Sequence, residues 1–398
     1  MWFRVFMVAL SLSLWGITLW LATHQNNDAA ILGRYSPSYF LLIVTMLGLS
    51  GSATFLSFSK GFRLIYPYRQ GATLLVTSAA VSLCLAEVVI RLLDPIGISY
   101  YQESKRYHLD KIADPYLYYR HQSNLIEEYQ GVSVHTNSLG LRDDEVPAQK
   151  SGELRVLFLG DSVTFGWGVE ASDSFVKQVG DLLEKRLQVP IRAINSGVGS
   201  YNTTTENAFL QRHGEALQPD AVVLVYVSND VEAFPGTPFD PWTRQALKGK
   251  NPPQVLSILV GKSWVYRLIS HIGRHWGGGG QQSFDLESAG WQESLTALAA
   301  AHRYCADRGI PFGLFMYRMV PGGPENEMAR HLRDVADREG FYYHDLLAAF
   351  DGQDVRLLVN SVVDSHPNRR GHELLALEFE GFLENVLAPA ARGLSEAR

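Results

Sequence analysis

Cysteine is scarce in this sequence, with two residues among 398. Cys84 lies in a long apolar stretch and Cys305 in the more polar remainder, so we expect no disulfide between them. No C-x-x-C pair, H-E-x-x-H motif or other metal-ligand spacing occurs, and we predict neither a metal ion nor a cofactor.

Blocks of basic residues are also missing from the part of the chain after the apolar N-terminal region, and the formal net charge is −6. The electrostatic signature of nucleic-acid binding is therefore absent, and we predict no nucleic-acid partner. With 46% hydrophobic and 19% charged residues, the chain is too apolar to be a disordered protein. It is long enough for one large domain or two ordinary ones.

Apolar residues are concentrated in three stretches near the N-terminus, at residues 5–23, 38–58 and 72–93. Each is long enough to cross a bilayer as a helix. The first two contain no charged residue, and the third carries Glu87 and Arg91 at a spacing that lets them pair near the membrane interface. The sequence therefore predicts that residues 1–95 form a membrane anchor of three transmembrane helices.

The short loops between these stretches predict the orientation of the anchor. The loop 59–71 contains three basic residues, whereas the loop 24–37 contains one arginine and one aspartate. Because basic loops remain in the cytoplasm, the loop 59–71 should be cytoplasmic and everything after residue 95 extracytoplasmic. If residues 5–23 were a cleaved signal peptide instead, the later domain would face the same way.

The rest of the chain divides into two parts. Residues 96–150 are rich in tyrosine, histidine and charge, and we interpret them as a linker and covering segment. In residues 151–392, apolar runs of strand length alternate with amphipathic stretches, and these runs are 154–159, 191–194, 221–227, 312–317 and 341–343. This alternation predicts an α/β fold, a three-layer α/β/α sandwich around a parallel sheet. Residues 231–289 interrupt the pattern and are expected to be an insertion that builds or covers a binding site.

The stretch "VLFLGDSVTFGWGV" (156–169) places Ser162 directly after a buried strand, where a helix can begin. It is not a P-loop, because no lysine follows Gly166, and it is not an α/β-hydrolase elbow, because Thr164 replaces the last glycine. A serine in this position can simply cap the helix, or it can expose its hydroxyl above the sheet as a nucleophile.

Two other segments supply the partners of a nucleophilic serine. "YVSND" places the amide of Asn229 at the end of a strand, and "VVDSHPN" places His366 two residues after Asp364, ahead of the final helix. A serine, a histidine with an acidic neighbour and an asparagine donor are what acyl transfer through a tetrahedral intermediate requires.

With these segments the chain resembles the SGNH hydrolase superfamily, the GDSL esterase/lipase group. The segments "FLGDS", "INSGVGSYNT", "VSND" and "DSHPNRRGH" occur in the order of the family's four blocks, and the resemblance covers roughly residues 150–390. It implies a flavodoxin-like fold in which Ser162 is the nucleophile, His366 the base, and Asn229 and the Ser162 backbone amide oxyanion donors.

The sequence departs from the family's pattern at three places. The glycine of the second block aligns with Ser200, although Gly199 is adjacent, so either backbone amide could be the remaining oxyanion donor. The glycine two residues before Asn229 is replaced by Val227, which narrows the pocket.

The third departure concerns the catalytic acid. Family members place it three residues before the histidine, where this chain has Val363. Asp364 is then the substitute, unless a backbone carbonyl orients His366. Asp161 and Asp230 are expected to support the nucleophile and third blocks by hydrogen bonds to nearby amides.

Taken with the predicted anchor, these residues indicate a serine esterase that cleaves O-acyl esters on cell-envelope polysaccharide, glycan or lipid at the outer face of the cytoplasmic membrane. The expected partners are the acylated glycan or lipid and the bilayer. An O-acyltransferase using the same serine and histidine is the first alternative. A catalytically idle domain that binds polysaccharide or scaffolds an export complex is the second.

Overall fold

The computed structural model describes residues 2–23, 37–94, 96–232, 263–269 and 285–396. The chain forms two compact units, Met1–Val89 and Ile90–Arg398. Most of the expected insertion 231–289 lies outside the described residues.

The first unit consists of apolar helices, and their bounds are α1 (Trp2–Thr23), α2 (Pro37–Ser57), α3 (Ser59–Ile65) and the larger part of α4 (Arg69–Leu93). By length and hydropathy, the segments Phe3–Thr23 and Tyr66–Leu93 could each cross a membrane, whereas the apolar part of α2, Ile43–Ser57, is shorter. Helices therefore form over all three predicted stretches, and two of them meet the requirements of a membrane span.

Hydroxyl side chains link α1 to α2. The hydroxyls of Ser11 and Thr54 are 2.8 Å apart, and those of Thr18 and Ser50 are 2.9 Å apart. Small hydroxyl residues allow close helix approach and hydrogen bonding without charge, as in membrane helix pairs.

The second unit contains a five-stranded parallel sheet in the order β6-β5-β7-β8-β9. The strands are β5 (Leu154–Leu159), β6 (Ile191–Asn195), β7 (Ala221–Tyr226), β8 (Phe312–Met316) and β9 (Tyr342–Asp345). Every residue of β5, β7 and β8 is buried, because helices cover both faces of a parallel sheet. The predicted α/β/α sandwich is confirmed, with each strand at its expected place.

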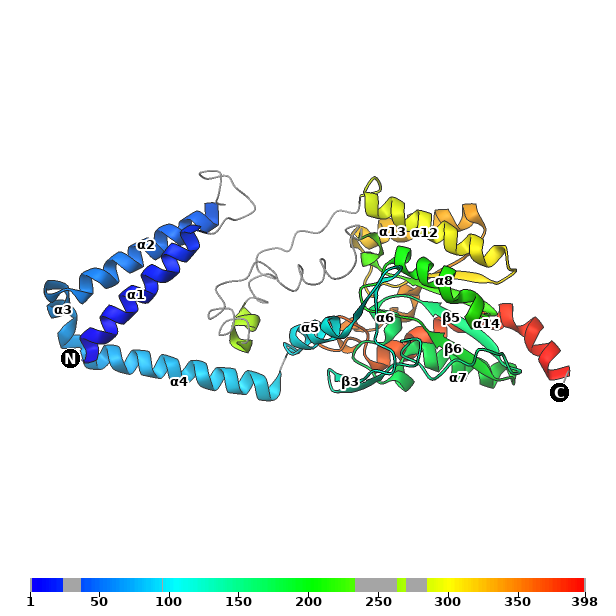
Figure 1. Cartoon of the computed structure of the whole chain (residues 1–398), viewed down its shortest axis with the longest axis horizontal. Coiled ribbons are helices and arrows are strands. Elements are labelled where there is room, and N and C mark those ends of the chain that lie inside the picture. The colour runs from blue at the N-terminus through cyan, green and yellow to red at the C-terminus, as the bar shows by residue number, and fades with distance from the viewer. Residues whose placement is uncertain (1, 24–36, 95, 233–262, 270–284, 397–398) are drawn as a thin grey trace. The chain divides into compact units, whose positions relative to one another are not determined.

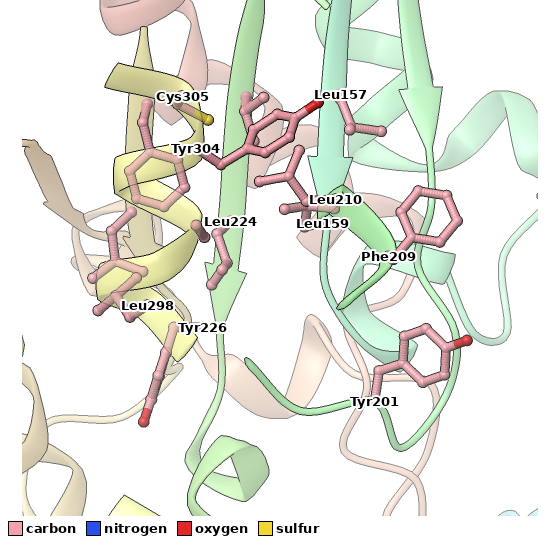
Figure 2. Packing of buried hydrophobic residues seen from close by; sticks show 14 of the residues in the cluster. Leu157, Leu159, Tyr201, Phe209, Leu210, Leu224, Tyr226, Leu298, Tyr304 and Cys305 are labelled. Carbon is pink, nitrogen blue, oxygen red and sulfur yellow. The ribbon is translucent and has the colours of Figure 1, made fainter. Parts of the chain in front are cut away.

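Helices form the two outer layers (Figure 1). One face is covered by α8 (Thr203–Leu217), α12 (Ala289–Ala306) and α13 (Gly323–Glu339), and the other by α7 (Phe175–Leu187) and α14 (Arg369–Glu396). Figure 2 shows Leu224 and Tyr226 of β7 together with Leu298 and Tyr304 of α12 in the core between the sheet and the first of these helix layers. The buried thiol of Cys305 belongs to the same core.

The segment between the apolar helices and the sheet is part of the second unit and packs against the sheet domain. It forms α5 (Tyr100–Asp110) and two antiparallel hairpins, β1 (Ile112–Asp114) with β2 (Tyr118–Arg120) and β3 (Ile126–Tyr129) with β4 (Val132–His135). We call residues 100–135 the covering segment. Its Tyr107 and Tyr129 pack against Phe165 and Trp167, which follow the nucleophile block.

Candidate active site

Ser162 begins the four-residue helix α6 (Ser162–Phe165), at the carboxyl end of β5. Asp161 caps this helix by accepting a hydrogen bond from the Val163 amide at 2.9 Å. A side chain at Gly160 would lie 2.1 Å from the Thr164 hydroxyl, so only glycine permits this tight turn. The turn leaves the Ser162 side chain facing a cavity.

Three predicted residues form a continuous chain of hydrogen bonds. The Ser162 Oγ lies 2.8 Å from His366 Nε2, and His366 Nδ1 lies 2.5 Å from Asp364 Oδ1. With Nδ1 donating to the carboxylate, Nε2 is left to accept the serine proton. Asp364 is buried, whereas His366 retains partial exposure, so the carboxylate is shielded while the imidazole reaches the cavity.

The second oxygen of Asp364 is held by two residues that the sequence did not single out for this role. Asp364 Oδ2 accepts from Trp167 Nε1 at 3.1 Å and from Asn360 Nδ2 at 3.2 Å. Trp167, whose role the sequence leaves open between pocket lining and core packing, is buried. Asn360 carried no recognisable motif, because only the folded loop brings it to Asp364.

The candidate oxyanion donors differ in whether they already have a hydrogen-bond acceptor. The Gly199 amide donates to Tyr107 Oη at 2.8 Å, so it is already engaged. Ser200 lines the cavity with Ser162, and in the described part of the chain neither of their amides has an acceptor. Asn229 also lines the cavity, and its Nδ2 donates to Asp161 Oδ2 across a long 3.3 Å. The backbone amides of Ser162 and Ser200 and the side chain of Asn229 are therefore free or easily freed to bind an oxyanion.

The two expected supporting aspartates lie close to the site. Asp161 Oδ2 lies 3.2 Å from Ser162 Oγ and accepts from Asn229 Nδ2. Asp230 accepts from the Val227 amide at 2.6 Å and from Thr203 Oγ1 at 2.8 Å, and burial raises its pKa to about 8. Asp230 thereby fixes the turn that presents Asn229.

Glu206 is a further buried acid that sequence analysis did not identify. It lies on α8, and neither of its carboxyl oxygens has a hydrogen-bond partner among the described residues. Burial, reinforced by the neighbouring Asp230 and Asp161, raises the pKa of Glu206 well above its usual range. Because Asp230 accepts two hydrogen bonds and Glu206 accepts none, we expect Glu206 to hold its proton.

The cavity over Ser162 has a volume of about 570 Å³. Its walls are mixed, with apolar side chains beside the catalytic hydroxyl and amide groups, and they include Tyr100, Val163, Val227, Tyr317, Met319 and Val359. The Tyr100 ring lies 6.1 Å from the ring of His366, centroid to centroid. Arg318 also borders the cavity, but Asp345 binds its guanidinium at 3.0 and 3.1 Å. The apolar part suits an acyl chain.

No curated protein matches the sequence. Among solved structures, a catalytic mutant of the acetylxylan esterase Axe2 from Geobacillus stearothermophilus is 18% identical, with 60% of this chain and 96% of that chain covered and a TM-score of 0.38. LAE5, an α/β hydrolase from the metagenome of Lake Arreo in Spain, is also 18% identical, with 61% and 98% covered and a TM-score of 0.38. The model of the GDSL-like lipase/acylhydrolase family matches residues 158–374, more than half of the chain. This chain therefore belongs to the GDSL-like lipase/acylhydrolase family and is an ester-cleaving hydrolase.

Proposed function

We propose that this protein is a membrane-anchored serine esterase that removes acyl groups from polysaccharide, glycan or lipid of the cell envelope. The observation that carries the proposal is the hydrogen-bonded series Ser162, His366 and Asp364 at the wall of a cavity. That series supplies a nucleophile, a base and an orienting carboxylate in one line.

The reaction follows from this geometry. His366 Nε2 takes the Ser162 proton as Oγ attacks the ester carbonyl, and Asp364 stabilises the imidazolium that forms. The amides of Ser162 and Ser200 and the Asn229 side chain stabilise the tetrahedral oxyanion. The intermediate collapses as His366 returns the proton to the departing alcohol, which leaves an acyl group on Ser162. A water molecule deprotonated by His366 then releases the acid and regenerates the serine.

A membrane-held substrate is supported by the joint between α4 and the covering segment. The last turn of α4, from Ile90, belongs to the same compact unit as the active site. Only two residues lie between Leu93 and Ile96, which limits the distance between them to roughly 10 Å. The Ile96 carbonyl accepts from the Val363 amide at 3.1 Å, three residues before His366. If α4 spans the bilayer, this short connection attaches the unit that carries the active site to the membrane.

Transfer of the acyl group to a sugar hydroxyl is a second candidate, favoured by a second hollow. This hollow has a volume of about 770 Å³ and shares Arg356 and Val359 with the catalytic cavity. Most of its remaining wall is polar, including Gln102, Glu103 and Asn360. An acceptor sugar bound there would replace water in the second half of the reaction.

The test of the proposal is hydrolysis of p-nitrophenyl acetate and of O-acetylated polysaccharide by the full chain. Ser162→Ala and His366→Ala should each lower kcat by at least about 10³-fold, because each removes a group that acts in the transition state. The exposed Ser151 and His135 supply matched controls, since Ser151→Ala and His135→Ala should retain full activity. Undiminished hydrolysis by Ser162→Ala would refute both the esterase and the transferase. Release of more than one equivalent of alcohol only when a sugar is added would favour the transferase.

A further inference from the structure

Three side chains of the covering segment bind the backbone at Gly199 and Ser200. Tyr107 Oη accepts from the Gly199 amide at 2.8 Å, and Tyr119 Oη donates to the Ser200 carbonyl at 2.5 Å. Lys111 Nζ donates to the Gly199 carbonyl. All three side chains are buried, and none lines the catalytic cavity. They therefore act on the backbone from behind the site.

Lys111 is an unusual residue to bury, because a desolvated ammonium is costly without compensation. Its Nζ lies 4.5 Å from the ring centroids of both Tyr107 and Tyr119, where the faces of the rings attract a cation. Nζ also lies 3.1 Å from His108 Nδ1. Burial lowers the pKa of His108 to about 2, so this nitrogen is neutral and can accept.

No carboxylate forms an ion pair with Lys111 in the described part of the chain. Burial lowers the pKa of Lys111 well below its usual range, and the charge of Asp161 opposes this shift. The Lys111 amine is thus surrounded by two aromatic faces, a carbonyl and a neutral histidine. A role in packing alone would not require an amine at this position. A methionine would fill the same space without the cost of desolvation.

The carbonyl that Lys111 binds belongs to a specific peptide group. Gly199 C=O and Ser200 N–H are the two ends of one conjugated amide, so a donor on its oxygen draws electron density from its nitrogen. The N–H becomes a stronger donor as a result, in the way that hydrogen bonds in a chain strengthen one another. This N–H belongs to Ser200, a residue that lines the cavity, and it has no acceptor among the described residues.

The backbone at Ser200 also has to be held in place. Its φ is +65°, a left-handed conformation that a serine adopts rarely. Such conformations persist where the surroundings determine them fully. A side chain at Gly199 would lie 2.7 Å from the Tyr107 ring, so the glycine allows Tyr107 to approach this peptide closely.

We propose that Lys111, assisted by Tyr107 and Tyr119, positions and polarises the Gly199–Ser200 peptide group so that its N–H stabilises the oxyanion of the tetrahedral intermediate. The three are positioning residues, since they act through the backbone. The inference rests on the proposed function, because it assigns the Ser200 amide to that reaction. It gives three buried side chains of the covering segment a positioning role in catalysis.

The test compares Lys111→Met and Lys111→Arg with wild type in the full chain, using p-nitrophenyl acetate. Removing an oxyanion donor outright costs about 10²–10³-fold in kcat, so losing its polarisation should cost about 10-fold or more. We expect kcat to fall in Lys111→Met with KM within about twofold of wild type, and to recover partly in Lys111→Arg. Lys105→Met, at an exposed position of α5, the helix that ends just before Lys111, should leave kcat unchanged.

A second measurement separates positioning from a merely structural role. A trifluoromethyl ketone forms a hemiketal with a catalytic serine, and its oxyanion occupies the same site as that of the intermediate. Its affinity should fall in Lys111→Met by the same factor as kcat/KM. If Lys111→Met does not fold, Tyr119→Phe removes a single oxygen and is expected to lower both quantities in the same way.

A folded Lys111→Met, or failing that a folded Tyr119→Phe, with wild-type kcat and wild-type ketone affinity would overturn the inference. Ser162→Ala is assayed alongside, so that a failure of this inference can be distinguished from a failure of the proposed function. If Ser162→Ala is inactive while Lys111→Met is unaffected, only this inference fails. If wild type shows no hydrolysis that depends on Ser162, the proposed function fails and the inference fails with it.

Discussion

At the scale of single residues, the loop before α14 explains how Asp364 reaches His366 from only two positions away. Asp364 Oδ1 accepts from the His366 backbone amide at 3.2 Å as well as from its Nδ1, which is the local ring that aspartates form in turns. The Asp364 carbonyl accepts from the Ser361 amide at 3.1 Å, which closes the turn. The spacing of two residues therefore lets one Asp364 oxygen bind both the backbone amide and the ring of His366.

Asp364→Asn tests this assignment. The amide group can donate to Nδ1, which would favour the wrong imidazole tautomer, and kcat should fall by about 10³–10⁴-fold. The measurement is steady-state hydrolysis of p-nitrophenyl acetate by the folded variant. Asp351→Asn, an exposed aspartate, is the matched control. A loss of less than tenfold would show that another group orients His366.

Glu206→Gln tests the buried acid. The folded-state pKa of Glu206 is raised, so wild type keeps a proton there that the unfolded chain releases above its ordinary pKa of 4.5. Wild-type stability should therefore fall as the pH rises above 4.5, and the glutamine variant should lose less stability. Thermal unfolding at pH 5 and pH 8 should show similar midpoints at pH 5 and a higher midpoint for the variant at pH 8. Equal pH dependence in both proteins would contradict a protonated Glu206.

At the scale of elements, sequence pattern predicted the parts that are made of continuous apolar runs. Strands such as β5 and β7 are buried on both faces, so their hydrophobicity alone identifies them. The helix α5, in contrast, is polar and short, and a helix of this kind is stable only through its tertiary contacts. The sequence therefore indicated a linker with short extended segments where the structure has a helix and two hairpins.

The same distinction applies to the site. Ser162, Asn229 and His366 follow apolar strands or precede a helix, so their positions at one sheet edge could be predicted. Lys111 and Asn360 reach the site only through folded loops, and no local pattern marks them. Side chains that bind backbone groups at long range leave no signal in one sequence.

Arg142 shows how the covering segment is joined to the nucleophile block. Its buried guanidinium donates to the carbonyls of Ser133, Phe165, Gly166 and Val169, and burial lowers its pKa to about 10. These bonds connect β4 with the turn after α6.

Arg142→Met should therefore destabilise the second unit, because it leaves four carbonyls, three of them on buried residues, without their charged donor. We expect a loss of about 2–4 kcal/mol in the free energy of unfolding, measured by urea denaturation. Arg338→Met, on an exposed position of α13, should change stability by less than about 0.5 kcal/mol. If Arg142→Met leaves the free energy of unfolding unchanged, aromatic packing alone holds the covering segment against the sheet domain.

At the scale of the whole molecule, the question is which side of a membrane the active site would face. Lys60 lies in the basic loop 59–71, just ahead of the candidate span Tyr66–Leu93, and basic loops remain cytoplasmic. Ser151 would then lie outside the cytoplasm, together with the catalytic cavity.

Single cysteines at the exposed positions Lys60 and Ser151, in a Cys84→Ser background, report the orientation directly, because the remaining Cys305 is buried. A membrane-impermeant maleimide should label Ser151→Cys in intact spheroplasts and Lys60→Cys only after permeabilisation. The reverse pattern would place the esterase in the cytoplasm, where envelope polysaccharide is not its substrate, and labelling of both positions without permeabilisation would show that the apolar helices do not span.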